Sequence, residues 1–143
     1  MASRPQGRRL SLDLAAVAAS CPQARDALRA ALRGTAVETS AVELAVTEAV
    51  TNAVVHAYRD RSSNDQPGRV RLTLDLDAAG AAVTVADDGL GMAPRADSPG
   101  LGFGLSLIAN VCDELRIDQR GDGTTVHMRF LFASSEHPLE HQE

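Results

Sequence analysis

The sequence predicts a two-layer α/β sandwich, in which a mixed, mostly antiparallel sheet carries its helices on one face. Short segments with alternating apolar residues predict strands, and four of the five are joined in pairs by short turns, which is typical of antiparallel hairpins. Three longer segments have helical periodicity and do not alternate regularly with the strands. This order favours helices that gather on one face of a single sheet.

The first half of the chain is expected to contain one strand and two helices. Alternating leucines predict a strand over residues 9–14. Helical periodicity then predicts a helix from residue 20 to about residue 33, closed by a glycine, and a second helix over residues 40–58. Ser40, with Glu43 three residues later, is typical of a helix start in which both side chains cap backbone N–H groups.

The second half is expected to contain two hairpins separated by a helix. Alternating valines and leucines predict strands over residues 70–76 and 83–85, joined by a short connection. A helix follows over residues 105–112, and the last two strands cover residues 115–119 and 124–132.

Length and composition predict one domain. The chain has 143 residues, of which 44% are hydrophobic and only 3% aromatic, so the core is expected to consist of Leu, Val, Ile and Ala. We expect the domain to cover residues 9–132. Residues 1–8 read as a flexible arm and residues 133–143 as a disordered tail, because neither has a periodic apolar pattern.

Charge and cysteine usage narrow the possible functions. The net charge of −5 belongs to the expected folded part and counts against direct nucleic-acid binding. Cys21 and Cys112 fit no metal-ligand spacing and are expected to be reduced. No apolar segment is long enough to span a membrane, and the N-terminus lacks the apolar core of a signal peptide, so a cytoplasmic location is expected.

Three polar residues recur four apart in the second expected helix: Glu48, Asn52 and His56. On an α-helix this spacing places them on one stripe, within an otherwise apolar run. A buried carboxylate and amide need partners, because each unpaired group costs a few kcal/mol. A hydrated Mg²⁺ with phosphates is one such partner, since this ion prefers oxygen ligands. A packed, hydrogen-bonded histidine remains an equal alternative for His56.

Acidic residues and glycines follow the strand at residues 83–85. Asp87 shares the parity of the buried valines, so it should point toward the buried face, whereas Asp88 should point away. A buried carboxylate needs donors, and the amino group of a purine is one. Gly89 and Gly91 would let a ligand approach the backbone, although a simple Asp-Gly turn explains them as well.

A second glycine-rich segment leads directly into the third expected helix. Gly100, Gly102 and Gly104 could offer backbone N–H groups to an anion at the helix N-terminus, or could form only a flexible loop. Farther along, Thr124 begins the last strand on its apolar side. Its hydroxyl could bond a base or Asp87, or could satisfy a local backbone group.

In this order, the motifs resemble those of the nucleotide-binding domain shared by gyrase, heat-shock chaperones, histidine kinases and mismatch-repair ATPases, the GHKL superfamily. Within it, AVTEAVTNAVVHAY and GTTV are similar to the helix and final strand of anti-sigma factor serine/threonine kinases of the RsbW and SpoIIAB type. The resemblance covers roughly residues 10–132. It implies the Bergerat, or histidine-kinase-like ATPase, form of the α/β sandwich, with ATP between the helices and a lid.

The resemblance also implies residue roles. Glu48 would be the catalytic base toward a serine hydroxyl, Asn52 would bind Mg²⁺, and Asp87 would bond the adenine amino group with the help of Thr124. The full set implied to contact ATP or ADP consists of Asn52, His56, Asp87, Gly89, Gly91, Gly100, Gly102, Phe103, Gly104, Leu105 and Thr124. Two roles remain open for Thr51: contact with the nucleotide, or a hydrogen bond to a carbonyl group within the helix.

The partners implied by this resemblance are a sigma factor, an anti-anti-sigma protein of the STAS type as the phosphorylation substrate, and a second copy in a homodimer. Two alternatives remain. Only residues 92–99 separate the two glycine motifs, and so short a lid is compatible with an ATP-binding regulatory module that lacks efficient kinase activity. A stand-alone histidine kinase catalytic domain is less expected, because only about twenty residues precede the first helix.

Overall fold

The structure, a computed structural model, describes residues 8–57, 68–88, 106–120 and 123–132. Its elements follow the predicted order of strand, two helices, two strands, helix and two strands. They are β1 (Arg9–Ala15), α1 (Ser20–Ala31), α2 (Thr39–Asn52), the π-helical turn η1 (Ala53–Ala57), β2 (Arg69–Leu76), β3 (Gly80–Asp87), a short helix at 106–111, β4 (Glu114–Arg120) and β5 (Gly123–Leu131).

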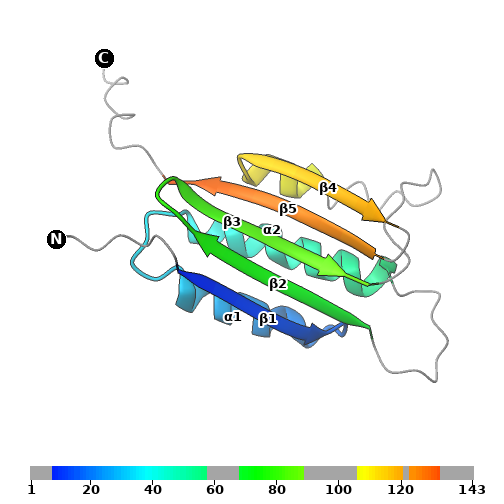
Figure 1. Ribbon diagram of the computed structural model, residues 1–143. Coiled ribbons are helices and arrows are strands. Elements are labelled where there is room, and N and C mark those ends of the chain that lie inside the picture. The colour runs from blue at the N-terminus through cyan, green and yellow to red at the C-terminus, as the bar shows by residue number, and fades with distance from the viewer. Residues whose placement is uncertain (1–7, 58–67, 89–105, 121–122, 133–143) are drawn as a thin grey trace, which may run out of the picture.

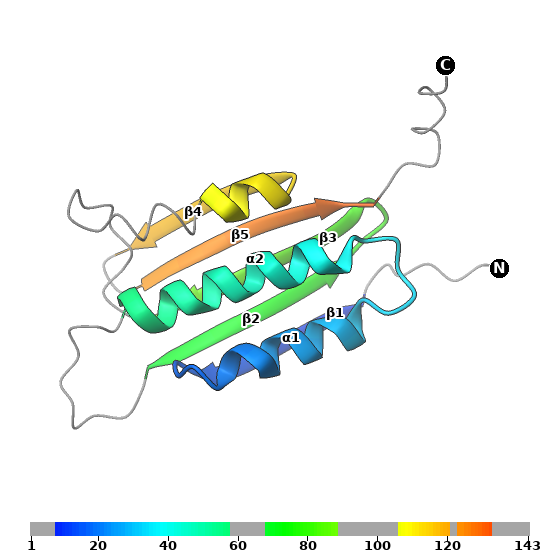
Figure 2. The same cartoon turned by 180° about the vertical axis from the view of Figure 1, so that it is seen from behind.

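The five strands form one sheet in the order β1-β2-β3-β5-β4, and all four ladders are antiparallel. Figure 1 shows the sheet in front, and the reverse view in Figure 2 shows α1, α2 and the 106–111 helix lying together on its other side. The predicted two-layer sandwich with helices on one face is therefore confirmed. The opposite face of the sheet carries no helix among the described residues.

The core lies between the helices and the covered face of the sheet. Alternation along each strand sends the aliphatic residues to that face, so Leu72, Leu74, Val83 and Val85 are fully or almost fully buried. The helices contribute aliphatic residues of the same kind, among them Leu28, Val42, Val46 and Val50. Phe130 is the one aromatic side chain in the described part of this core, which confirms the aliphatic composition expected from the sequence.

The second helix differs from the prediction in its last part. The α-helix ends at Asn52, and residues 53–57 form a π-helical turn where the sequence predicted an α-helix through residue 58. Residue 58 itself lies outside the described residues. The spacing argument therefore holds for Glu48 and Asn52, which lie within α2, but not for His56, which lies beyond it. Such π turns are rare and are frequently found at functional sites.

The expected cap at the start of this helix is also different. The N-cap residue is Glu38, and the Ser40 hydroxyl bonds the Glu38 carboxylate instead of a backbone N–H group. Glu43 does not reach back to the cap, because its carboxylate accepts two hydrogen bonds from Arg29 of α1, at 2.8 and 2.9 Å. Tertiary pairing between two helices has replaced the local capping pattern. The glycine expected to close α1, Gly34, has a positive φ of 83°.

Candidate functional site

Three predicted site segments meet at one end of the sandwich. In Figure 1, the C-terminal end of α2, the C-terminal end of β3 and the N-terminal end of β5 all lie at the right-hand end of the sheet. This follows from the topology, because β3 and β5 are antiparallel neighbours and α2 packs across the sheet roughly along β3. The fold thereby brings three residues that are distant in sequence to the same end of the sheet: Asn52, Asp87 and Thr124.

Asp87 and Thr124 lie directly opposite each other on neighbouring strands. They are register partners between β3 and β5, and Asp87 is also the partner of Val70 on β2. Because Val70 and Thr124 are buried on the helix side, this row belongs to the covered face, and the predicted inward parity of Asp87 is confirmed. Asp88 belongs to the other side, where its carboxylate accepts a bond of 3.4 Å from the backbone N–H of Arg69.

Gly123 fixes how closely these two strands approach each other. A Cβ atom at this position would lie 2.1 Å from the carbonyl oxygen of Asp87, so only glycine fits. Its φ of 155° is also a conformation that side chains disfavour. The sequence showed Gly123 only as the residue before Thr124. Its role in positioning Asp87 against Thr124 depends on the strand register, which the sequence does not specify.

Asn52 is buried, with 4% of its surface exposed, at the last α-helical position of α2. Its Nδ2 atom has no hydrogen-bond partner among the residues that the structure describes. An unpaired buried amide is costly, typically by about 1–3 kcal/mol, so this group is poised for a polar ligand. Glu48 is half-buried one turn earlier on the same helix, as the spacing predicts.

The hydroxyl groups of Thr51 and Thr47 lie on the same helix as Glu48 and Asn52. Thr51 contacts the thiol of Cys21 on α1, with 3.6 Å between sulfur and oxygen, so it links the two helices. Because its partner lies on another helix, this contact is neither of the two roles that the sequence left open for Thr51. Thr47 has a buried hydroxyl with no hydrogen-bond partner in the described part of the chain, a feature that the sequence did not single out.

The predicted glycine loops lie outside the described residues. They comprise Gly89, Gly91, Gly100, Gly102, Phe103, Gly104 and Leu105. For His56 the structure describes the backbone, within η1, but not the side chain. No group of three or more His, Cys, Asp or Glu residues within the described ranges could hold a metal ion. A metal site here would need other oxygen donors, such as an amide and ligand phosphates.

This arrangement agrees with a family model that matches residues 10–130, described as the histidine kinase-like ATPase domain. The chain belongs to this family. The predicted superfamily is thus confirmed, and membership implies that the domain binds a nucleotide. No curated protein matches the chain significantly. Of the helices in the described ranges, none combines the length and apolar character needed to cross a lipid bilayer.

Two solved structures share the fold of this histidine kinase-like ATPase domain. The crystal structure of the RsbU and RsbW domains of a Mycobacterium tuberculosis protein matches 89% of the chain at 21% identity with a TM-score of 0.66. The histidine kinase domain of a blue-light activated histidine kinase from Erythrobacter litoralis matches 80% of the chain at 25% identity with a TM-score of 0.56. The chain spans 34% and 60% of these two chains.

Proposed function

We propose that this protein is an ATP-dependent protein-serine/threonine kinase that also acts as an anti-sigma factor. In this function it binds a sigma factor and phosphorylates a STAS-type anti-anti-sigma protein that antagonises this binding. The observation that carries the proposal is the convergence of Asp87, Thr124 and buried Asn52 at the end of the sheet where α2 stops. The RsbW-type neighbour and the matching helix and strand motifs support the choice of branch.

Each of these residues has a task that its environment suits. Asp87 accepts the adenine amino group, and the Thr124 hydroxyl, opposite it, assists; a carboxylate on the covered face offers strong acceptors to such a donor. Glu48, one helical turn from Asn52, takes the proton of the attacking serine hydroxyl. The glycine motifs supply backbone N–H groups to the phosphates.

A magnesium ion is implied by this function, and Asn52 fits it. The amide oxygen is a ligand of the kind that Mg²⁺ prefers, and the Nδ2 group, which has no partner among the described residues, would then face a phosphate or water oxygen. When bound, the ion neutralises charge on the phosphates. We expect Asn52→Ala to lose the difference in ATP affinity between buffers with Mg²⁺ and with EDTA. An unchanged difference would contradict this role of Asn52.

Phosphate transfer is the direct test. The protein is incubated with γ-labelled ATP and candidate STAS proteins, beside a Glu48→Gln variant whose ATP affinity is measured separately. Acid-stable phosphate on the STAS protein, lost in Glu48→Gln while ATP binding persists, would support the kinase. ATP binding without transfer to any STAS protein would favour the regulatory module, for which the short segment 92–99 is the argument.

Histidine phosphorylation is the second candidate activity. The likeness to the Erythrobacter litoralis histidine kinase domain, at 25% identity, is the observation that favours it. The two activities differ in the stability of the product, because phosphoserine survives acid whereas phosphohistidine is hydrolysed. Acid-labile label on a partner protein would therefore replace the serine assignment.

A further inference from the structure

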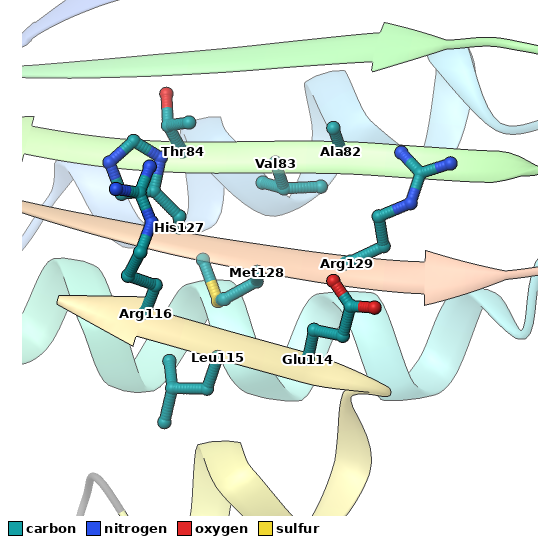
Figure 3. Close-up of a pocket in the computed structure, with 9 residues that line it drawn as sticks. All are labelled: Ala82, Val83, Thr84, Glu114, Leu115, Arg116, His127, Met128 and Arg129. Atoms are coloured by element: carbon teal, nitrogen blue, oxygen red, sulfur yellow. The ribbon is translucent and has the colours of Figure 1, made fainter.

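The strand register arranges the residues of the sheet in rows that cross neighbouring strands, and each row lies on one face. We call the face opposite the helices the open face. Figure 3 shows both faces on β4, where Leu115 points away from Glu114 and Arg116. Alternation places Gln119 on the same side of β4 as Leu115. The register agrees, because Gln119 is the partner of Thr124, which is buried on the covered face.

All polar side chains that the described strands place on the covered face lie in a single row. This row runs from Asp87 on β3 through Thr124 on β5 to Gln119 on β4. Every other covered-face residue of these strands is apolar, namely Leu10, Leu12, Leu14, Val70, Leu72, Leu74, Leu76, Ala81, Val83, Val85, Val126, Met128, Phe130, Leu115 and Ile117. The polar row lies at the end of the sheet where α2 stops, so Gln119 belongs to the same end as the candidate nucleotide site.

Exposure along this row indicates on which side of Asp87 a ligand can lie. On the β2 side, Val70 and Leu14 are 0% and 8% exposed, because the helices already cover that part of the sheet. On the β4 side, the row ends in Gln119, which is exposed although it belongs to the covered face. A ligand held at Asp87 would displace core side chains if it extended toward β2, whereas toward β4 it approaches a side chain that solvent reaches.

The phosphates of a nucleotide are expected on this same side. The 106–111 helix lies against β4 on the covered side of the sheet (Figure 1 and Figure 2), and its Ile108 is fully buried. Under the proposed function, the glycine motif that binds the phosphates ends at Gly104, just before this helix in sequence. Neighbouring strands are about 4.8 Å apart, so Gln119 lies roughly 10 Å from Asp87 across β5. A nucleotide held by its base at Asp87 therefore brings its phosphates, rather than its base, close to Gln119.

We propose that Gln119 is a phosphate-binding residue of this site, and that its side-chain amide donates hydrogen bonds to phosphate oxygens of bound ATP. An amide carries two N–H donors, and hydrogen bonds to charged acceptors are roughly twice as strong as those between neutral groups. Water can satisfy an exposed glutamine, so this role contributes to binding and not to folding. The inference rests on the proposed function, because the base at Asp87 sets the direction in which the phosphates lie.

Nucleotide binding by charge variants of Gln119 tests this role. Isothermal titration calorimetry in a Mg²⁺ buffer measures the dissociation constants of ATP, ADP and adenosine. Gln119→Glu sets a carboxylate against the phosphates, so it should weaken ATP binding by roughly 10-fold and ADP binding by less. Gln119→Lys supplies a cationic donor and should bind ATP at least as tightly as the wild type. Both variants should bind adenosine within about twofold of the wild type, because adenosine has no phosphate.

Thr125 provides the matched control. It follows Thr124 on β5 but lies on the open face, where its register partner on β4 is Asp118. Thr125→Glu and Thr125→Lys introduce the same charges on the other side of the sheet and should change ATP affinity by no more than about twofold. Thermal melting shows whether each variant is folded. In the wild type, the side-chain NH₂ signals of Gln119 in a ¹⁵N NMR spectrum should shift with ATP but not with adenosine.

Three results would contradict this role of Gln119, and they differ in what else they affect. Equal losses of ATP and adenosine affinity in Gln119→Glu would mean that residue 119 acts on the base, and would overturn the phosphate contact. ATP binding that both Gln119 variants leave unchanged would also overturn it, while the proposed function would stand. A wild-type protein that binds no nucleotide would overturn the proposed function and the inference together.

Discussion

The two faces of the sheet come from the same strands but hold their polar groups in different ways. On the open face, ion pairs such as Arg9–Asp75 and Arg69–Asp13 are at least 47% exposed at each side chain. On the covered face, the buried polar residue that the described strands contribute is Thr124, at one end beside Asp87. A polar group beneath the helices therefore needs a partner in the protein or a ligand, whereas one on the open face can also be satisfied by water.

Substitutions at two adjacent residues of β2 should give the largest difference in stability between the two faces. Leu72 is fully buried under the helices, so Leu72→Ala should cost about 3 kcal/mol of unfolding free energy through lost burial and a cavity. Thr73 lies on the open face and shares a hydroxyl contact with Thr84, so Thr73→Ala should cost less than about 1 kcal/mol. Urea denaturation at low protein concentration measures both. Similar losses would contradict the division of the sheet into a packed face and a solvated one.

Asp87 and Asp88, at the end of β3, allow the two faces of the sheet to be compared for their effect on ATP binding. Asp87→Asn should weaken ATP binding by roughly 100-fold, because the neutral amide presents an acceptor of lower charge and a competing donor to the adenine. Asp88→Asn removes the same charge from the other side of the strand and should change the affinity by no more than about twofold. Isothermal titration calorimetry measures both constants, and equal losses would sink the adenine assignment.

Much of this fold could be predicted from the sequence because its strands and helices have simple apolar periods. The alternation of Val83 and Val85 is sufficient to predict that Asp87 lies on the covered face. The four-residue spacing likewise placed Glu48 and Asn52 on one side of α2. Both predictions depend only on local geometry, which the chain itself specifies.

Features that depend on register or on tertiary pairing could not be predicted in this way. The requirement for glycine at Gly123 arises from the carbonyl group of Asp87 on another strand. The polar row that ends in Gln119 appears only when the pairing of β3, β5 and β4 is known. The sequence pattern predicts a local cap for Glu43, whereas its carboxylate forms a bidentate bond with Arg29 of another helix.

The ion pair between Arg29 of α1 and Glu43 of α2 gives the smallest expected effect on stability. It extends the comparison to the outer surface of the helical layer. The hydrogen bond from Arg29 lowers the pKa of Glu43 below its usual 4.5. A carboxyl group whose pKa is lowered by folding stabilises the folded protein at pH values above the pKa that the same group has in the unfolded chain. This contribution is lost as the pH falls through the lower pKa of the folded state.

The Tm of Glu43→Gln should therefore lie below that of the wild type by about 2 °C or less at neutral pH, since exposed ion pairs contribute little. The difference should shrink between about pH 5 and about pH 3, as Glu43 of the wild type takes up a proton. Calorimetric melting across this range measures it, with Glu38→Gln at the N-cap of the same helix as the control. A difference that persisted in acid would mean that packing of the Glu43 side chain, rather than its charge, joins α1 to α2.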